Sequence, residues 1–239
     1  YYSKPNNPMC QLGTALATVN MLNENLDLTI DEYVTVNWAA VATAINLMGG
    51  LDGIDVKEEY IDDLRGYITE TVESTGIAST HLEHGGVQHL DGIQAVALCR
   101  YRYSGLNDTG RTENQRMVIG KMLEKAKTLS VGQLISIADE VFPMVTTTYS
   151  LNEVLEMINL ISKLHIGETT GFPYTTKYFN VPDAYKAYSS QSTDCLMPVD
   201  LAGDVKALHE FLYDQKDYQP SPTVQRLSES ILSDSGYYQ

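Results

Sequence analysis

Two patterns of apolar residues, one helical and one typical of strands, take turns along this chain and constrain its fold more than any other feature. Stretches with apolar residues three or four positions apart predict amphipathic helices, and short β-branched runs between them predict strands. The helical pattern covers residues 11–24, 41–48, 93–97, 111–126, 131–142, 151–163 and 201–213, and the strand pattern covers 33–38, 54–56, 145–148, 177–182 and 195–199. Helices that alternate with strands in this way predict an α/β sandwich.

Three further segments show other patterns. Residues 57–85 are polar and mixed with weak helical signals, which predicts an excursion on the surface. The segment LCRYRYS (98–104) follows a short helix that Asp91 is expected to cap, and it predicts an extended strand. A stretch dense in turn residues, SGLNDTG (104–110), then leads into the next helix.

A length of 239 residues is enough for one large domain or two small ones. The continuous alternation favours a single domain over residues 1–217, followed by a tail at 218–239 with a predicted peripheral helix. No run of apolar residues approaches the ~20 that a membrane span needs, and the first thirty residues lack the pattern of a signal peptide.

Basic residues are scarce in this chain, yet several are concentrated in one short segment. The sequence has 16 Lys+Arg against 31 Asp+Glu, a formal net charge of −15. Such a surface repels a phosphate backbone, which argues against nucleic acid as a partner. The segment RYRYSGLNDTGRTENQR (100–116) nevertheless contains Arg100, Arg102, Arg111 and Arg116. Guanidinium groups gathered in an acidic chain predict a binding site for phosphate groups.

The spacing of this segment arranges four polar side chains in two pairs. On a strand, Arg100 and Arg102 project from one face, with Cα atoms roughly 6–7 Å apart. On the following helix, Arg111 and Gln115 share a face near the N-terminus, where backbone N–H groups favour anions. We expect Asp108 to orient an arginine or to help hold a cation. The alternative is that the arginines form salt bridges with the abundant carboxylates, and spacing alone leaves both interpretations open.

The cysteines predict no metal site. Cys10, Cys99 and Cys195 are widely spaced and lack the ligand spacing of a structural zinc site. One disulfide between Cys10 and Cys195 and three reduced thiols fit the sequence equally well. Cys99 is expected to have a packing role.

The histidines and the short motifs likewise point to no common enzyme class. His81, His84 and His89 have a spacing that suits no standard metal site, and we expect them to be exposed in a loop. The sequence contains no GxSxG elbow, Walker loop or HExxH motif. Common hydrolase and nucleotide chemistries therefore lack support.

The run GGVQHLDGIQAVALCRYRYSGLNDTGRTENQRMVI (85–119) contains a helix of the LxGxQAL type, an RxR segment and a turn that leads to GRxxxQ. Together these features resemble the signature of the LytR–CpsA–Psr family of cell-wall glycopolymer transferases. The resemblance takes in residues 30–56 upstream and 149–158 downstream, and it covers roughly residues 10–214.

The resemblance implies an α-β-α sandwich with a central mixed sheet. It implies a phosphotransferase that moves an anionic glycopolymer from an undecaprenyl diphosphate carrier to a sugar hydroxyl of peptidoglycan. By resemblance, Arg100, Arg102 and Arg111 are catalytic, and together with Gln115 they contact the lipid pyrophosphate, whose charge Mg²⁺ neutralises further. The implied partners are the polyprenyl diphosphate-linked glycan, the peptidoglycan acceptor and the membrane, through an N-terminal anchor. The implied location is the extracellular face of the cytoplasmic membrane, in the cell wall.

The chain also departs from the family pattern. Family domains begin with a strand pair that carries an aspartate and an RD step, and the opening YYSKPNNPMC has no counterpart of it. We therefore expect residues 1–217 to be an N-terminally incomplete domain of this kind, with its metal ligands unassigned. The alternative function is a non-catalytic module of the same fold that binds polyprenyl phosphates or cell-wall glycan.

Overall fold

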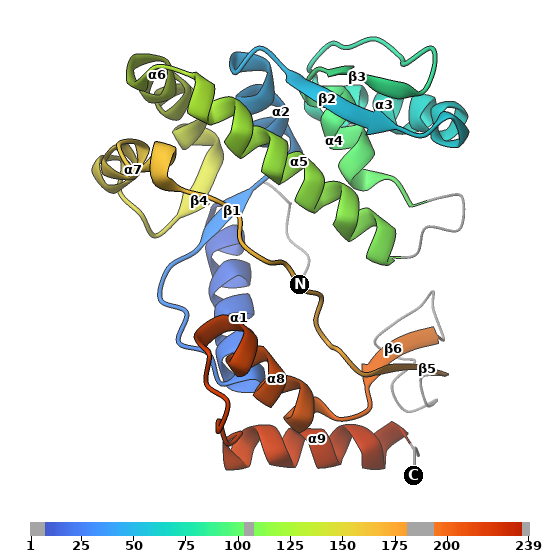
Figure 1. Cartoon of the computed structure of the whole chain (residues 1–239), viewed down its shortest axis with the longest axis vertical. Helices are drawn as coiled ribbons and strands as arrows, with labels where there is room; N and C mark the ends of the chain where they lie inside the picture. The colour runs from blue at the N-terminus through green and yellow to red at the C-terminus, as the bar shows by residue number, and fades with distance from the viewer. Residues whose placement is uncertain (1–7, 103–107, 181–193, 236–239) are drawn as a thin grey trace. The chain divides into compact units, whose positions relative to one another are not determined.

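The structure is a computed structural model that describes residues 8–102, 108–180 and 194–235 (Figure 1). The chain divides into two compact units, unit 1 (Tyr1–Asp31 with Glu168–Gln239) and unit 2 (Glu32–Gly167). Unit 2 is one continuous stretch of chain, whereas unit 1 combines the two ends. The prediction of one domain over residues 1–217 stays a prediction, and the predicted helix in the tail is present as α9 (Pro222–Ser235).

Unit 2 contains most of the helices and two of the described sheets. In chain order its elements are β1 (Val34–Val36), α2 (Trp38–Leu47), β2 (Leu51–Val56), η1 (Glu58–Tyr60), α3 (Ile61–Thr75), β3 (Gly86–Leu90), α4 (Gly92–Arg100), α5 (Asp108–Thr128), α6 (Val131–Val141), η2 (Phe142–Met144), β4 (Val145–Thr147), α7 (Leu151–Ile158) and η3 (Ile161–Lys163).

The mixture of helices and strands agrees with the predicted α/β class. Within the described ranges the strands pair as two-stranded antiparallel sheets, β1 with β4, β2 with β3, and β5 (Thr176–Asn180) with β6 (Asp194–Pro198). The central mixed sheet that the resemblance implies is therefore not formed by these strands. None of the helices built from described residues has the length and apolar character that crossing a membrane requires.

Helix α4 is the most deeply buried element of unit 2. All of its residues before Arg100 are buried. It contacts α2, α3, α5 and β3, so its apolar side chains face the core in every direction, as expected for a helix without a polar face. Its start is fixed by a capping box in which Asp91 and Gln94 each accept a backbone N–H from the other. The predicted Asp91 cap is confirmed.

The first residue of α4 lies against the backbone of α2. A Cβ added to Gly92 would overlap the carbonyl oxygen of Ala42 and would lie 2.7 Å from its Cα atom. The Gly92 N–H also donates to the Asn46 side chain at 2.7 Å. Only glycine permits this approach, because any other side chain would push the two helices apart.

Residues 57–85 differ from the predicted surface excursion. They form η1 and then α3, whose residues Ile61, Leu64 and Ile68 are buried in the core. The sequence analysis missed this apolar stripe because most residues between its members are charged or glycine: Asp62, Asp63, Arg65 and Gly66. The loop after α3 is held to the start of α4, where Ser79 donates to the Asp91 carboxylate at 2.6 Å and Gln94 donates to the Thr80 carbonyl.

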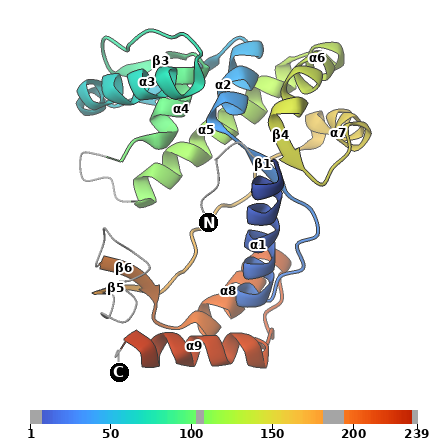
Figure 2. The same cartoon turned by 180° about the vertical axis from the view of Figure 1, so that it is seen from behind.

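Unit 1 is built from α1 (Pro8–Leu26), the β5–β6 hairpin, α8 (Leu201–Tyr213) and α9. Figures 1 and 2 both show α8 and α9 side by side, and Leu201, Val205 and Val224 form the buried centre of their contact. The two ends of the chain are joined where the His209 Nε2–H donates to the Leu26 carbonyl at 2.9 Å. Tyr218 stacks on the His209 ring at 3.7 Å.

One buried carboxylate connects α8 to the start of the hairpin. The Asp204 side chain is 2% exposed and accepts hydrogen bonds from the backbone N–H and the hydroxyl of Thr175. Burial raises the pKa of the Asp204 carboxyl, the Thr175 hydrogen bonds oppose that shift, and the nearby Asp200 charge adds to it. The net pKa is above the usual value, so folding favours the protonated form.

We predict that Gly92→Ala destabilises unit 2 by about 1–3 kcal/mol, because the new methyl group overlaps the α2 backbone. The measurement is urea unfolding followed by the fluorescence of Trp38, the single tryptophan, which begins α2. Gly66→Ala on α3 is the matched control. No atom lies within 4 Å of its Cβ position, so it should stabilise the helix by about 0.5–1 kcal/mol. Equal midpoints for the two variants would contradict the close approach.

We predict that Asp204→Asn gains stability relative to the wild type as pH rises. A carboxyl whose pKa is raised by folding contributes stability below its unfolded pKa and loses that contribution as pH rises through the folded pKa. The asparagine keeps an acceptor for Thr175 but does not titrate. Calorimetric unfolding at several values between about pH 3 and about pH 7 tests this difference. A difference in Tm that does not vary over the series would show that Asp204 has no such role.

Candidate functional site

The arginine segment begins inside a helix rather than on a strand. Arg100 is the last residue of α4, and Tyr101 is its C-terminal cap. The prediction of an extended segment from residue 98 is therefore wrong for residues 98–100, and the strand geometry proposed for Arg100 and Arg102 does not apply. The physical reason is burial. Leu98 and Cys99 are buried in the core like the preceding turn of α4, and tertiary packing of this kind overrides a local strand pattern.

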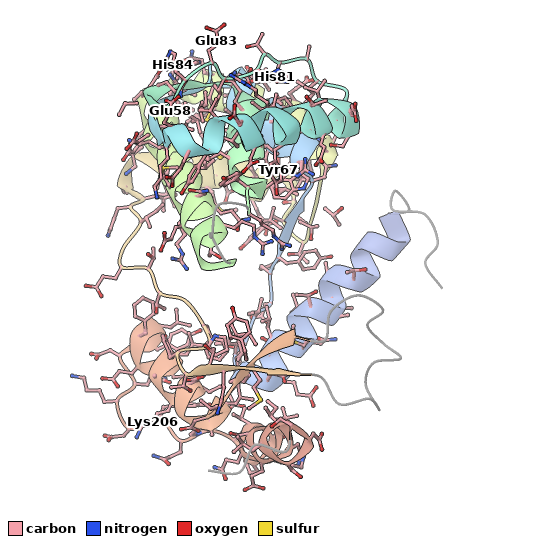
Figure 3. All side chains as sticks on the ribbon, turned by 90° about the vertical axis from the view of Figure 1, so that its right-hand side faces the viewer. Glu58, Tyr67, His81, Glu83, His84 and Lys206 are labelled. Carbon is pink, nitrogen blue, oxygen red and sulfur yellow. The ribbon has the colours of Figure 1, made fainter. Side chains whose placement is uncertain are left out.

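Two adjacent residues of α3 bind the Arg100 guanidinium. Its Nη1 donates to the Thr71 hydroxyl at 2.6 Å, and its Nη2 lies 3.2 Å from a carboxylate oxygen of Glu70. The ring of Tyr67, labelled in Figure 3, is 5.9 Å from the guanidinium carbon, at the outer range of a cation–π contact. Arg100 therefore forms a salt bridge with Glu70, as the alternative interpretation expected, although the Arg100 side chain remains 24% exposed.

Helix α5 is attached to the end of α4 by two side-chain amides. Gln115 donates to the Cys99 carbonyl at 3.1 Å, and Asn114 donates to the Leu98 carbonyl at 3.3 Å. Both carbonyls belong to the last turn of α4, where the Leu98 carbonyl also accepts the backbone N–H of Tyr101 at 3.3 Å. Gln115 is thereby bonded to Cys99, the residue that precedes Arg100. Arg100 and Gln115 thus both belong to the junction of α4 and α5, although the Arg100 guanidinium binds α3.

The other predicted site residues flank this junction. Arg111 lies one turn before Gln115 on α5, and its Nε atom is buried. Arg102 is exposed two residues beyond the end of α4. Asp108 is the first residue of α5, and its side chain is outside the part of the chain that the structure describes.

Both helices of the junction carry positively charged side chains. The first turn of α5 carries backbone N–H groups without helical acceptors, and Arg111 belongs to this turn. Arg100 and Arg102 add two further positive charges from the end of α4. The arrangement can therefore hold phosphate oxygens by charge-assisted hydrogen bonds in a chain whose net charge is −15.

Of the three cysteines, only Cys99 has a side chain among the described residues. Cys99 is a free, buried thiol, and burial raises its pKa to about 12, so it is protonated at neutral pH. The packing role predicted for it is confirmed. The side chains of Cys10 and Cys195 lie outside the described residues, so their disulfide remains open.

The three histidines of the central region are exposed, as predicted. His81 and His84 lie in the loop before β3, on the outer edge of unit 2 in Figure 3, and His89 is on β3 itself. The His89 Nδ1 is 2.7 Å from a carboxylate oxygen of Asp52, and Lys125 binds the other oxygen at 3.1 Å. Among the described residues, no three His, Cys, Asp or Glu side chains form a metal site.

Sequence reasoning missed the residues of α3 that bind Arg100. Thr71 is 29 positions from Arg100 and Glu70 is 30 positions away, so no local spacing connects them. A signal for Thr71 was nonetheless present in the helical period, because Leu64, Ile68 and Thr71 recur at intervals of four and three. A threonine in an apolar stripe is a buried hydroxyl, which must find a hydrogen-bond partner.

Comparisons with known proteins agree with the sequence around this junction. The model of the LytR_cpsA_psr family matches residues 4–195. The chain is 27% identical over 179 residues to TagV of Bacillus subtilis, a polyisoprenyl-teichoic acid–peptidoglycan teichoic acid transferase, covering 70% of the chain and 43% of TagV. It is 30% identical over 119 residues to the TagU transferase of Enterococcus faecalis, covering 49% of the chain and 34% of TagU. The chain thus spans less than half the length of these relatives.

Solved structures show the same fold. The crystal structure of Bacillus subtilis TagV is 22% identical with a TM-score of 0.57, covering 85% of this chain and 70% of that one. A structure from Enterococcus faecalis, described as a transcriptional regulator, is 18% identical with a TM-score of 0.63, covering 95% of this chain and 75% of that one. These likenesses confirm the predicted fold class. Because the family model matches well over half of its residues, the chain belongs to the LytR_cpsA_psr family.

Proposed function

We propose that this chain is the phosphate-binding part of a cell-wall glycopolymer transferase. In this proposal Arg100, Arg102, Arg111 and Gln115 bind the pyrophosphate of a polyprenyl diphosphate-linked glycopolymer. The transfer forms a phosphodiester with a sugar hydroxyl of peptidoglycan and releases the polyprenyl phosphate. The proposed setting is the cell wall, at the extracellular face of the membrane.

The observation that carries the proposal is the junction of α4 and α5. The amide of Gln115 connects α5 to the last turn of α4, where Arg100 emerges from the core. Arg111 belongs to the first turn of α5, one turn before Gln115. The names of the TagV and TagU relatives supply the substrate class, a polyisoprenyl-linked teichoic acid with a peptidoglycan acceptor.

The chemistry required of these residues is electrostatic. As the bond to the leaving phosphate lengthens, negative charge moves onto that phosphate, and fixed guanidinium groups stabilise it. Arginine suits this role because its planar fork stays charged and binds two oxygens at once. The backbone N–H groups at the start of α5 add donors that need no rearrangement during the reaction.

We predict that Arg102→Ala in the full-length protein lowers kcat/KM for transfer about tenfold to a hundredfold. This range follows from a charge-assisted hydrogen bond of about 1.5–3 kcal/mol, at 1.36 kcal/mol per decade of rate. Arg102 is exposed, so the substitution removes a charge without opening the core. The assay follows transfer of a polyprenyl diphosphate-linked glycan to peptidoglycan, with Mg²⁺ because the family resemblance implies the ion, and with EDTA in parallel.

The matched control is Arg226→Ala on α9. Arg226 is also exposed and carries the same charge, but it belongs to unit 1. It should leave transfer unchanged. An equal loss in both variants would indicate a general effect of net charge and would refute the assignment of Arg102. Binding of the carrier without any transfer by the wild type would favour the non-catalytic module.

A further inference from the structure

Arg100 is held by two contacts that differ in kind, although both come from neighbouring residues of α3. The Thr71 hydroxyl accepts from Nη1 at 2.6 Å and is completely buried, whereas the Glu70 carboxylate accepts from Nη2 at 3.2 Å and its side chain is 63% exposed. Together these bonds use two of the five N–H groups of a guanidinium. A ligand that approaches from solvent therefore meets one contact it can displace and one it cannot.

Thr71 is a fixed acceptor. Its hydroxyl hydrogen is directed to the Tyr67 carbonyl, one helical turn earlier, at 2.6 Å. This bond orients the oxygen lone pairs away from the helix axis and toward Arg100. Because the hydroxyl is buried, losing Arg100 as a partner would leave its acceptor capacity unused inside the core. The guanidinium is thus anchored at one end.

Glu70 is a weak and replaceable partner. The pair opens to solvent on the Glu70 side, so water solvates the carboxylate well when the pair breaks, and such a pair contributes little to stability. A diphosphate carries more negative charge than a carboxylate, and its oxygens bind a guanidinium in the bidentate manner. It can therefore take the place of Glu70 while the Thr71 bond remains.

We propose that Thr71 is a positioning residue for Arg100 and that Glu70 is an exchangeable counter-ion that an anionic ligand displaces from the same guanidinium. This inference rests on the proposed function and adds a regulatory element to its site. In the free protein Glu70 neutralises Arg100 and prevents it from binding weak anions. When a diphosphate binds, the carboxylate moves to solvent, and the arginine stays in place because Thr71 still holds it.

The test is calorimetric binding of inorganic pyrophosphate to the chain of residues 1–239 at low ionic strength. Glu70→Gln removes the competing charge, and we expect Kd to fall roughly threefold to tenfold. Glu73→Gln is the matched control, because it removes the same charge from an exposed position of the same helix. The control should change Kd by less than about twofold.

Thr71 is tested by a pair of substitutions. Thr71→Val keeps the shape but removes the acceptor, and we expect Kd to rise roughly fivefold to tenfold. Thr71→Ser restores the hydroxyl and should return Kd to the wild-type value. Trp38 fluorescence checks that each variant is folded. In an Arg100→Ala background, Thr71→Val should have no further effect on Kd, which a general loss of packing would not reproduce.

Each outcome separates this inference from the proposed function. Binding by the wild type that is unaffected by Glu70→Gln, or affected equally by Glu73→Gln, overturns the counter-ion role and leaves the arginine site intact. A Thr71→Val variant that binds normally overturns the positioning role. If the folded wild type does not bind pyrophosphate, the placement of the phosphates on this junction is wrong, and the inference fails with it.

Discussion

The burial of helix α4 is the constraint on which both the core and the candidate site depend. Every residue from Gly92 to Cys99 is buried, so the helix has no face that solvent could solvate. Its polar groups appear only at the ends, where the Asp91 capping box and the Gln115 amide satisfy them. The candidate site therefore lies where this buried helix reaches the surface. Arg100, its last residue, is attached to a rigid element of the core.

The sequence predicted the order of the elements well, because most helices carry a clear apolar period. It failed at the end of α4 for a specific reason. In LCRYRYS the alternation of arginine with tyrosine has the period of a strand, while the burial of Leu98 and Cys99 by α3 and α5 decides the actual conformation. It also missed β3, because alternation in Gly86–Leu90 is broken by polar residues on both faces. Tertiary contacts of this kind cannot be read from a local pattern.

The role of the site residues stays a prediction, whereas part of their predicted geometry is wrong. Composition and helical spacing were enough to single out Arg100, Arg111 and Gln115, and the structure brings Gln115 to the end of α4 beside Arg100. The pairing of Arg100 with α3 depended on a contact across 29 positions, and no periodicity within the segment contains that information. Charge content predicted that carboxylates would be near, but only the fold decides which carboxylate, and which hydroxyl, lies beside it.

The division of the chain has a consequence for synthesis. Unit 2 is uninterrupted, whereas α1 must wait for α8 and α9, which lie beyond it in the sequence. A ribosome emits residues in order, so the whole of unit 2 is available to fold while α1 still lacks the His209 side chain that binds its last carbonyl. During that interval the nascent chain contains a complete unit 2 and an incomplete unit 1.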